Sequence, residues 1–165
     1  MSLDGTQRRW LIVNAVLVTA IVNAGLNALF AWLGMHGRDH VVPWAWGPAS
    51  TGTDTLGTLF VLPFVTCLVC TTAVRFERRS GSLTRLRGLR SALWLAALPA
   101  PLLPRAACCG AAVFAVLAVP VTLVLLVVAE GAISVGSFVA YKAIFGVVLG
   151  AVVTPLIALR AMAEP

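Results

Sequence analysis

Charge is scarce in this chain of 165 residues. Only 11% of the residues are charged, with 12 Lys and Arg against 6 Asp and Glu, whereas 60% are hydrophobic and the mean hydropathy is +0.98. A water-soluble domain of this size needs far more polar surface. The composition therefore predicts an integral membrane protein. The net charge of +6 would suit a nucleic-acid partner in a soluble protein, but the arginines here cluster between apolar stretches, so no nucleic-acid partner is expected.

Catalytic and cofactor motifs are absent as well. The chain has no P-loop, no G-x-S-x-G, no H-E-x-x-H and no Rossmann fingerprint. Since the sequence shows no nucleophile–base pair, we predict that the protein is not an enzyme and has neither catalytic residues nor a cofactor. No carboxylate lies deep inside an apolar stretch. Small four-helix drug exporters depend on such a glutamate for proton exchange, so that class of transporter is not expected.

Four apolar stretches are long enough to cross a bilayer, which takes about 20 helical residues. They cover residues 10–34, 54–75, 106–129 and 137–159. A basic segment at about residues 76–105 separates the second stretch from the third. Its second half, 91–104, is too short to span and is interpreted as an interfacial helix anchored by Trp94. The predicted fold is a single all-α membrane domain over residues 1–165, a bundle of four transmembrane helices.

The distribution of arginine sets the predicted orientation of this bundle. The N-terminal tail, the basic segment together with Arg75 at its start, and the C-terminal tail hold 10 of the 12 basic residues, whereas the two connections at the opposite end hold only Arg38. Loops rich in Lys and Arg remain in the cytoplasm. Both termini are therefore predicted to be cytoplasmic, with the basic segment on anionic lipid headgroups of the bilayer. A preference for Arg over Lys, amid abundant Ala, Val, Leu and Gly, suggests a GC-rich bacterium and hence the bacterial cytoplasmic (inner) membrane.

The only lysine of the chain, Lys142, lies inside the fourth apolar stretch. Lys142, Gly146, Gly150 and Thr154 recur every four residues, so they share one face of a helix. A cation at the centre of a membrane helix costs roughly 2.5–3.5 kcal/mol, whereas small residues let a second helix approach closely. Gly146 and Gly150 are therefore predicted to pack helices, either within the chain or between subunits.

Each of the other stretches carries polar side chains at about the depth of Lys142. These side chains are Asn23, Asn27, Asp54, Thr58 and Thr122. One interpretation is a shallow polar cavity, open outward, in which Lys142 attracts an anion or pairs with Asp54. The other is that the amides and hydroxyls hydrogen-bond between helices, while Lys142 extends its ammonium group to the lipid headgroups.

Four cysteines lie toward the predicted cytoplasmic half. They are Cys67 and Cys70 on the second stretch and Cys108 and Cys109 on the third. Four thiols could bind a soft metal, but cysteine also serves as a small apolar residue in lipid, and no metal site is predicted. The outer connections contain no cysteine, which excludes structural disulfides there. A quinone-linked disulfide generator is excluded as well, because such an enzyme needs thiols at the outer face.

These features lead to two predictions of function from different classes. The first is a small structural or accessory membrane protein, which packs with itself as a homo-oligomer or with a larger partner membrane protein. The alternative is a subunit of a small-solute or anion transporter or channel, with Lys142, Asn23 and Asn27 in its outward-open cavity. Four helices of this length enclose little room, so a conduit is expected to require an oligomer.

Overall fold

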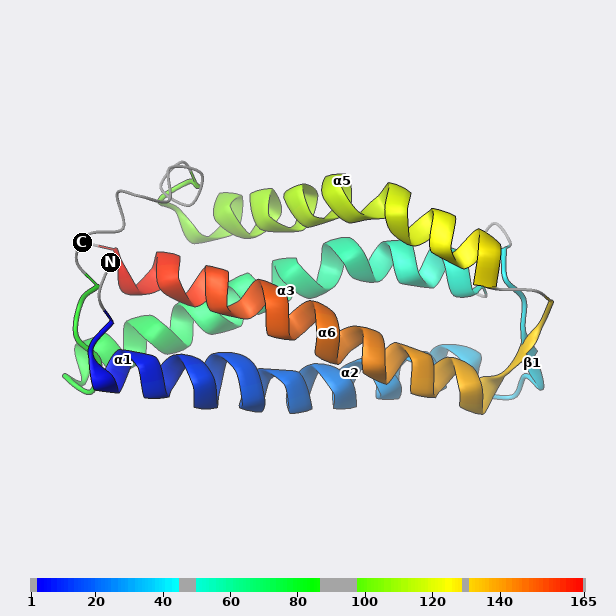
Figure 1. Ribbon diagram of the computed structural model, residues 1–165, viewed down its shortest axis with the longest axis horizontal. Coiled ribbons are helices and arrows are strands. Elements are labelled where there is room, and N and C mark those ends of the chain that lie inside the picture. Colours follow the sequence, from blue (N-terminus) through cyan, green and yellow to red (C-terminus); the bar gives the residue numbers. More distant parts are fainter. Residues whose placement is uncertain (1–2, 45–49, 87–97, 129–130, 165) are drawn as a thin grey trace.

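The computed structural model describes residues 3–44, 50–86, 98–128 and 131–164, which are mostly helical (Figure 1). The helical elements are α1 (Gly5–Trp10), η1 (Leu11–Val18), α2 (Thr19–Met35), α3 (Thr51–Arg79), α5 (Leu102–Val128) and α6 (Val135–Met162). α1, η1 and α2 follow one another without a break and form one long first helix. This helix and α3, α5 and α6 are long and apolar enough to cross a membrane. The predicted all-α architecture with four such helices is therefore confirmed.

Most of the helices extend beyond the predicted apolar stretches, because the polar residues that flank these stretches also favour helix. Asp4 caps α1, accepting a hydrogen bond from the backbone N–H of Gln7, and Ser50 caps α3 in the same way through Thr53. α5 begins at Leu102, before the predicted end of the basic segment at residue 105. Proline is tolerated in a first helical turn, where its missing N–H would have no partner. The stretch 87–97, which holds half of the predicted interfacial helix 91–104, lies outside the described residues.

The four long helices pack as an open row. α2 packs against α6, α6 against α3, and α3 against α5. In Figure 1 α5 lies along one edge of the row and the first helix along the other, with α3 and α6 between them. In the apolar windows of α3 and α6, 44% of the residues are buried, against 11% in the first helix and 6% in α5. Both edge helices therefore leave most of their apolar surface uncovered.

The two ends of the row differ in how they are closed. One end carries a short antiparallel sheet of β1 (His40–Val41) and β2 (Ile133–Ser134), and we call it the strand end. The other holds both termini, and we call it the terminal end (Figure 1). There the segment after α3 is tied to the first and last helices, because Gln7 Nε2 donates to the Thr84 carbonyl at 3.2 Å and the Leu86 N–H donates to the Met162 carbonyl at 3.0 Å.

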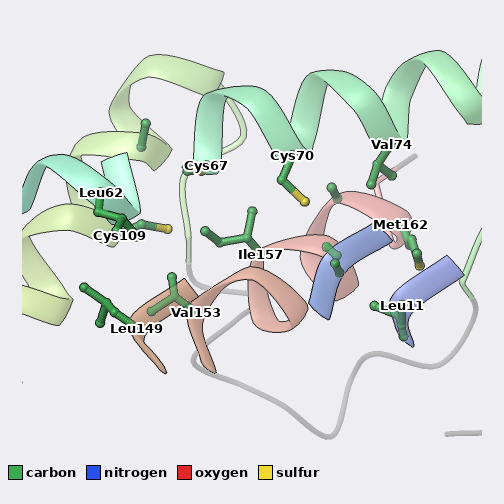
Figure 2. Close-up of a cluster of buried hydrophobic side chains, with 14 of the residues drawn as sticks. Leu11, Leu62, Cys67, Cys70, Val74, Cys109, Leu149, Val153, Ile157 and Met162 are labelled. Atoms are coloured by element: carbon green, nitrogen blue, oxygen red, sulfur yellow. The ribbon is translucent and has the colours of Figure 1, made fainter. Parts of the chain in front are cut away.

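The main apolar core lies between α3, α5, α6 and η1. Figure 2 shows side chains from these helices gathered in one cluster, namely Leu11, Leu62, Cys67, Cys70, Val74, Cys109, Leu149, Val153, Ile157 and Met162. A smaller cluster of Ala31, Met35, Val41 and Phe138 joins α2, α6 and β1 at the strand end. Between these two clusters the contacts of α6 with α2 and α3 include several polar side chains, and the candidate site lies there.

Candidate functional site

Lys142 of α6 is held inside the row by two residues of α3. The residue is 2% exposed, and its Nζ lies 2.5 Å from Asp54 Oδ2. The ammonium group also donates to the Thr58 hydroxyl and, at 3.4 Å, to the Asp54 carbonyl. Asp54 and Thr58 are four residues apart and face the same side of α3. The positive charge is therefore compensated within the chain, as in the paired form of the predicted cavity.

Two asparagines of α2 complete the polar group through close contact with the glycines of α6. Asn27 Nδ2 donates to the Asn23 carbonyl at 2.8 Å. A Cβ added at Gly146 would lie 2.6 Å from Asn27 Nδ2, and one at Gly150 would overlap the Asn23 amide. Gly146 and Gly150 thus face α2 of the same chain and lie in close contact with Asn23 and Asn27. The buried Asn23 Nδ2 has no hydrogen-bond partner among the described residues.

A cavity of about 350 Å³ opens between α2 and α3, in front of Lys142. Its polar lining consists of Asn23, Asn27, Asp54, Thr58, Thr66 and Lys142. The rest of the wall is apolar, with Leu26, Phe30 and Val61 among its residues. An apolar pocket in which a few polar groups converge is typical of small-ligand sites. Five of the six predicted cavity residues line it, whereas Thr122 lies half-buried on α5, outside the lining.

The two charges of the site are not equally accessible. The Asp54 side chain is 30% exposed and the Lys142 side chain only 3%. The carboxylate therefore borders the open side of the cavity, while the ammonium group lies deeper, next to the amides of α2. The site can offer a ligand one positive group, one negative group and the donors and acceptors of two amides. Among the lining residues there is no nucleophile–base pair.

A second cavity of about 260 Å³ lies between the first helix and α3 on the side of the terminal end. It adds the polar side chains Asn14, Thr19 and Glu77, and it shares Asn23 and Thr66 with the first cavity. Asn14 lies in η1, a π-helical segment, and its carbonyl accepts a hydrogen bond from the Thr19 hydroxyl at 2.8 Å. Such segments occur often at functional sites. Asn14 and Thr66 are single polar residues within apolar stretches, and Glu77 lies among the arginines of the basic segment, so no sequence pattern groups these three residues with the site.

The cysteines lie apart from these cavities, except for Cys70 at the wall of the second one. Cys67, Cys70 and Cys109 are buried, Cys108 is exposed, and all four are free thiols. Figure 2 shows the three buried cysteines among aliphatic side chains of the core. Within the described parts of the chain, no three His, Cys, Asp or Glu residues converge as a metal site would require. The arrangement fits cysteine as a core residue.

The terminal end contains an ionic cluster that no sequence pattern predicts. Glu164 accepts hydrogen bonds from Arg75 Nε at 2.7 Å and from Arg105 Nη1. Arg105 is 1% exposed and also donates to the carbonyls of Pro99 and Ala100 at 2.8 and 2.7 Å. Burial by itself would raise the pKa of Glu164, but hydrogen bonds and charge from the two arginines outweigh it and hold this pKa below its ordinary value. The cluster joins α3, the start of α5 and the C-terminal segment.

Comparison with protein-family models, with curated proteins and with solved structures finds no match to this chain. A function must therefore be inferred from the geometry of the cavity between α2 and α3. Of its features, the Lys142–Asp54 pair is chemically the most specific, because an ion pair beside an apolar cavity can exchange its partners for those of a ligand.

Proposed function

We propose that this chain is a multi-pass membrane protein that binds a small zwitterionic ligand at the Lys142–Asp54 pair. The observation that carries the proposal is that the pair forms part of the wall of a cavity of about 350 Å³. A pair that served only to join α3 to α6 would be covered by apolar side chains. Here the Asp54 side chain is 30% exposed, so a ligand can approach it.

The ligand is zwitterionic because of charge balance in a medium of low dielectric. A purely anionic ligand on Lys142 would leave the Asp54 carboxylate beside it without a partner, and an uncompensated charge in such a place is costly. A ligand with one anionic and one cationic group exchanges partners with both residues at once. Its anionic group takes the Lys142 ammonium, its cationic group takes the Asp54 carboxylate, and no charge is left over.

The orientation in the membrane follows from the arginines. The terminal end carries Arg8, Arg9, Arg78, Arg79 and Arg85, most of them exposed, whereas the strand end carries Arg38. Positively charged flanks remain in the cytoplasm, so the proposed arrangement has both termini inside and the Lys142 site in the outer half of the bilayer. For a bacterial protein, this bilayer is the cytoplasmic membrane.

Thermal unfolding in detergent with small charged compounds tests the proposal. Glycine, which is zwitterionic, and phosphoethanolamine, which carries both an ammonium group and a phosphate group, should raise the Tm of the protein, whereas ethanolamine and inorganic phosphate should not. A site saturated at 100 times Kd gains about 2.7 kcal/mol of stability. Lys142→Met should remove the shift, and Thr122→Ala, outside the cavity, should retain it. No shift with either zwitterion, or an equal shift in Lys142→Met, would contradict the proposal.

A second candidate function is the accessory role, and α5 is the observation in its favour. α5 packs mainly on α3, and only 6% of its apolar window is buried. Its outer face could contact lipid or a helix of a partner membrane protein. Native mass spectrometry of the gently extracted protein separates these cases, since a stoichiometric protein complex without a small adduct favours the accessory role. A small-molecule adduct favours the ligand site.

A further inference from the structure

The two cavities between the first helix and α3 lie next to each other, and together we call them the groove. Their linings share Asn23, Leu26, Val65 and Thr66. The groove exists because α2 and α3 both pack on α6, which lies between them as the floor. On α3 its lining extends from Asp54 at the strand end to Glu77 at the terminal end. At 1.5 Å per residue this distance is about 35 Å, whereas the hydrocarbon core of a bilayer is about 30 Å thick.

Polar side chains line this groove at short intervals along its whole length. From the strand end they are Lys142 with Asp54, Thr58, Asn27, Asn23, Thr66, Thr19, Asn14 and Glu77. On the first helix, Asn27, Asn23, Thr19 and Asn14 follow one another at intervals of about 6–8 Å. A polar group in the groove would therefore find a new hydrogen-bond partner within about one helical turn of the last. An ordinary helix–helix seam between apolar segments has no need for such a series.

The open side of the groove is bordered by apolar side chains. Leu26 and Phe30 on α2 are 43% and 66% exposed, and Val61 and Val69 on α3 are 55% and 64% exposed. In a bilayer these rims face hydrocarbon. A water-soluble solute would need a path closed on all sides, because an open side exposes it to lipid. A membrane lipid has no such need, since its headgroup can occupy the groove while its acyl chains remain outside in the bilayer.

We propose that this groove binds phospholipids with a zwitterionic headgroup and lets the headgroup pass between the two leaflets. The inference rests on the proposed zwitterion site and names its ligand. At the strand end the phosphodiester pairs with the Lys142 ammonium group, and the headgroup ammonium pairs with the Asp54 carboxylate. Glu77 offers a carboxylate to the same ammonium at the terminal end. The proposed movement consumes no nucleotide and follows the lipid gradient in both directions.

Reconstitution of the full chain into phosphatidylcholine vesicles tests this inference. The vesicles contain a trace of phosphatidylethanolamine with a fluorophore on one acyl chain, so that its ammonium group stays free. After protein is incorporated, an impermeant reagent for primary amines is added outside. Without protein only the outer-leaflet lipid reacts, and with protein the inner-leaflet lipid should react as well, until almost all of it is modified. An entrapped soluble probe, phosphoethanolamine, should stay inside.

Two tryptophan substitutions provide a matched pair. Val22→Trp narrows the second cavity, which it lines, and lies outside the lining of the first cavity, so it should slow lipid movement to the rate of protein-free vesicles. It should leave the thermal shift with phosphoethanolamine in place. Val127→Trp adds the same side chain to the exposed face of α5, where Val127 is 76% exposed, and should move lipid as the wild type does.

The outcomes separate the two proposals. If the protein moves no lipid but still shows the thermal shift with zwitterions, the lipid path is overturned and the proposed binding site is retained. Absence of both overturns both. Equal lipid movement in Val22→Trp and wild type overturns the groove as the path. Escape of entrapped phosphoethanolamine without lipid movement assigns the site to a soluble solute and overturns the lipid inference.

Discussion

Gly150 of α6 lies directly against the side chain of Asn23 on α2, so closely that a Cβ at position 150 would overlap the Asn23 amide. One turn earlier, a Cβ at Gly146 would lie 2.8 Å from the Asn23 carbonyl oxygen. Two successive turns of α6 thus lack the side chains that would hold α2 away. The absence of these side chains sets the position of α2 and, with it, one wall of the groove.

Gly150→Ala should therefore destabilise the protein. Overpacking of a close contact costs about 1–3 kcal/mol, and the better helix propensity of alanine offsets about 1 kcal/mol of that. Gly25→Ala is the control, because a Cβ at position 25 of α2 meets nothing within 4 Å and gains the propensity term alone. Equilibrium unfolding in detergent micelles measures both. A Gly150→Ala protein as stable as Gly25→Ala would mean that α2 does not pack as closely as described.

The ion pair predicts an asymmetry between its two partners. Removal of one member of a fully buried pair costs about 3–5 kcal/mol, because the other charge is left without compensation. Asp54→Asn leaves a lysine side chain that is only 3% exposed, whereas Lys142→Met leaves an aspartate that is 30% exposed and partly solvated. Asp54→Asn should therefore be the more destabilising change, and the double variant should recover much of the loss. The same unfolding measurement checks the order, and the reverse order would place the pair in a different environment.

Most residues of the candidate site could be predicted from the sequence, but the order in which the helices pack could not. Depth along a helix follows from its fixed rise, so residues at equal depth on different spans could be selected. Lys142, Asp54 and Asn23 were selected in this way, and all three line the first cavity. The lateral order of helices depends on which faces pack, and no local pattern determines it. Thr122 has the right depth but lies on α5, which packs against α3 at the far edge of the row.

The ionic cluster at the terminal end shows a second limit of sequence reasoning. Arginines that flank apolar stretches are explained by topology alone, so nothing in the sequence distinguishes Arg105 from exposed arginines such as Arg79 and Arg85. Its partner Glu164 lies far along the chain, and the pairing depends on the tertiary contact of the C-terminal segment with α3 and α5. The cysteines illustrate the same point, since Cys108 and Cys109 are adjacent and yet only Cys109 faces the core.

Topology can be measured with single cysteines in a chain whose four native cysteines are replaced by alanine. Asp39→Cys at the strand end and Ser82→Cys at the terminal end both introduce exposed positions. Because the arginines lie mainly at the terminal end, an impermeant maleimide should label Asp39→Cys in intact cells. It should label Ser82→Cys only after the membrane is permeabilised. The opposite pattern would reverse the orientation and place Lys142 in the cytoplasmic half.

Glu164 makes the stability of the terminal end dependent on pH. Its two arginine partners hold its pKa below the ordinary value of 4.5, so the ionised form is favoured in the folded protein. The stabilisation is complete above pH 4.5, where the carboxylate is ionised in both the folded and the unfolded states. As the pH falls further, the unfolded state takes up the proton first. The contribution then decreases, and it is lost once the pH passes the folded pKa.

Glu164→Gln should remove this dependence on pH and should lower stability at neutral pH by about 3 kcal/mol, because Arg105 is left buried without a carboxylate. Unfolding in detergent between neutral pH and pH 3 measures both effects. Asp39→Asn is the matched control, since it neutralises an exposed carboxylate at the strand end and should leave the profile of the wild type unchanged. If Glu164→Gln and the wild type lose stability in parallel below pH 4.5, then another acid must be responsible, and Glu164 does not join α3 and α5 in the way its contacts indicate.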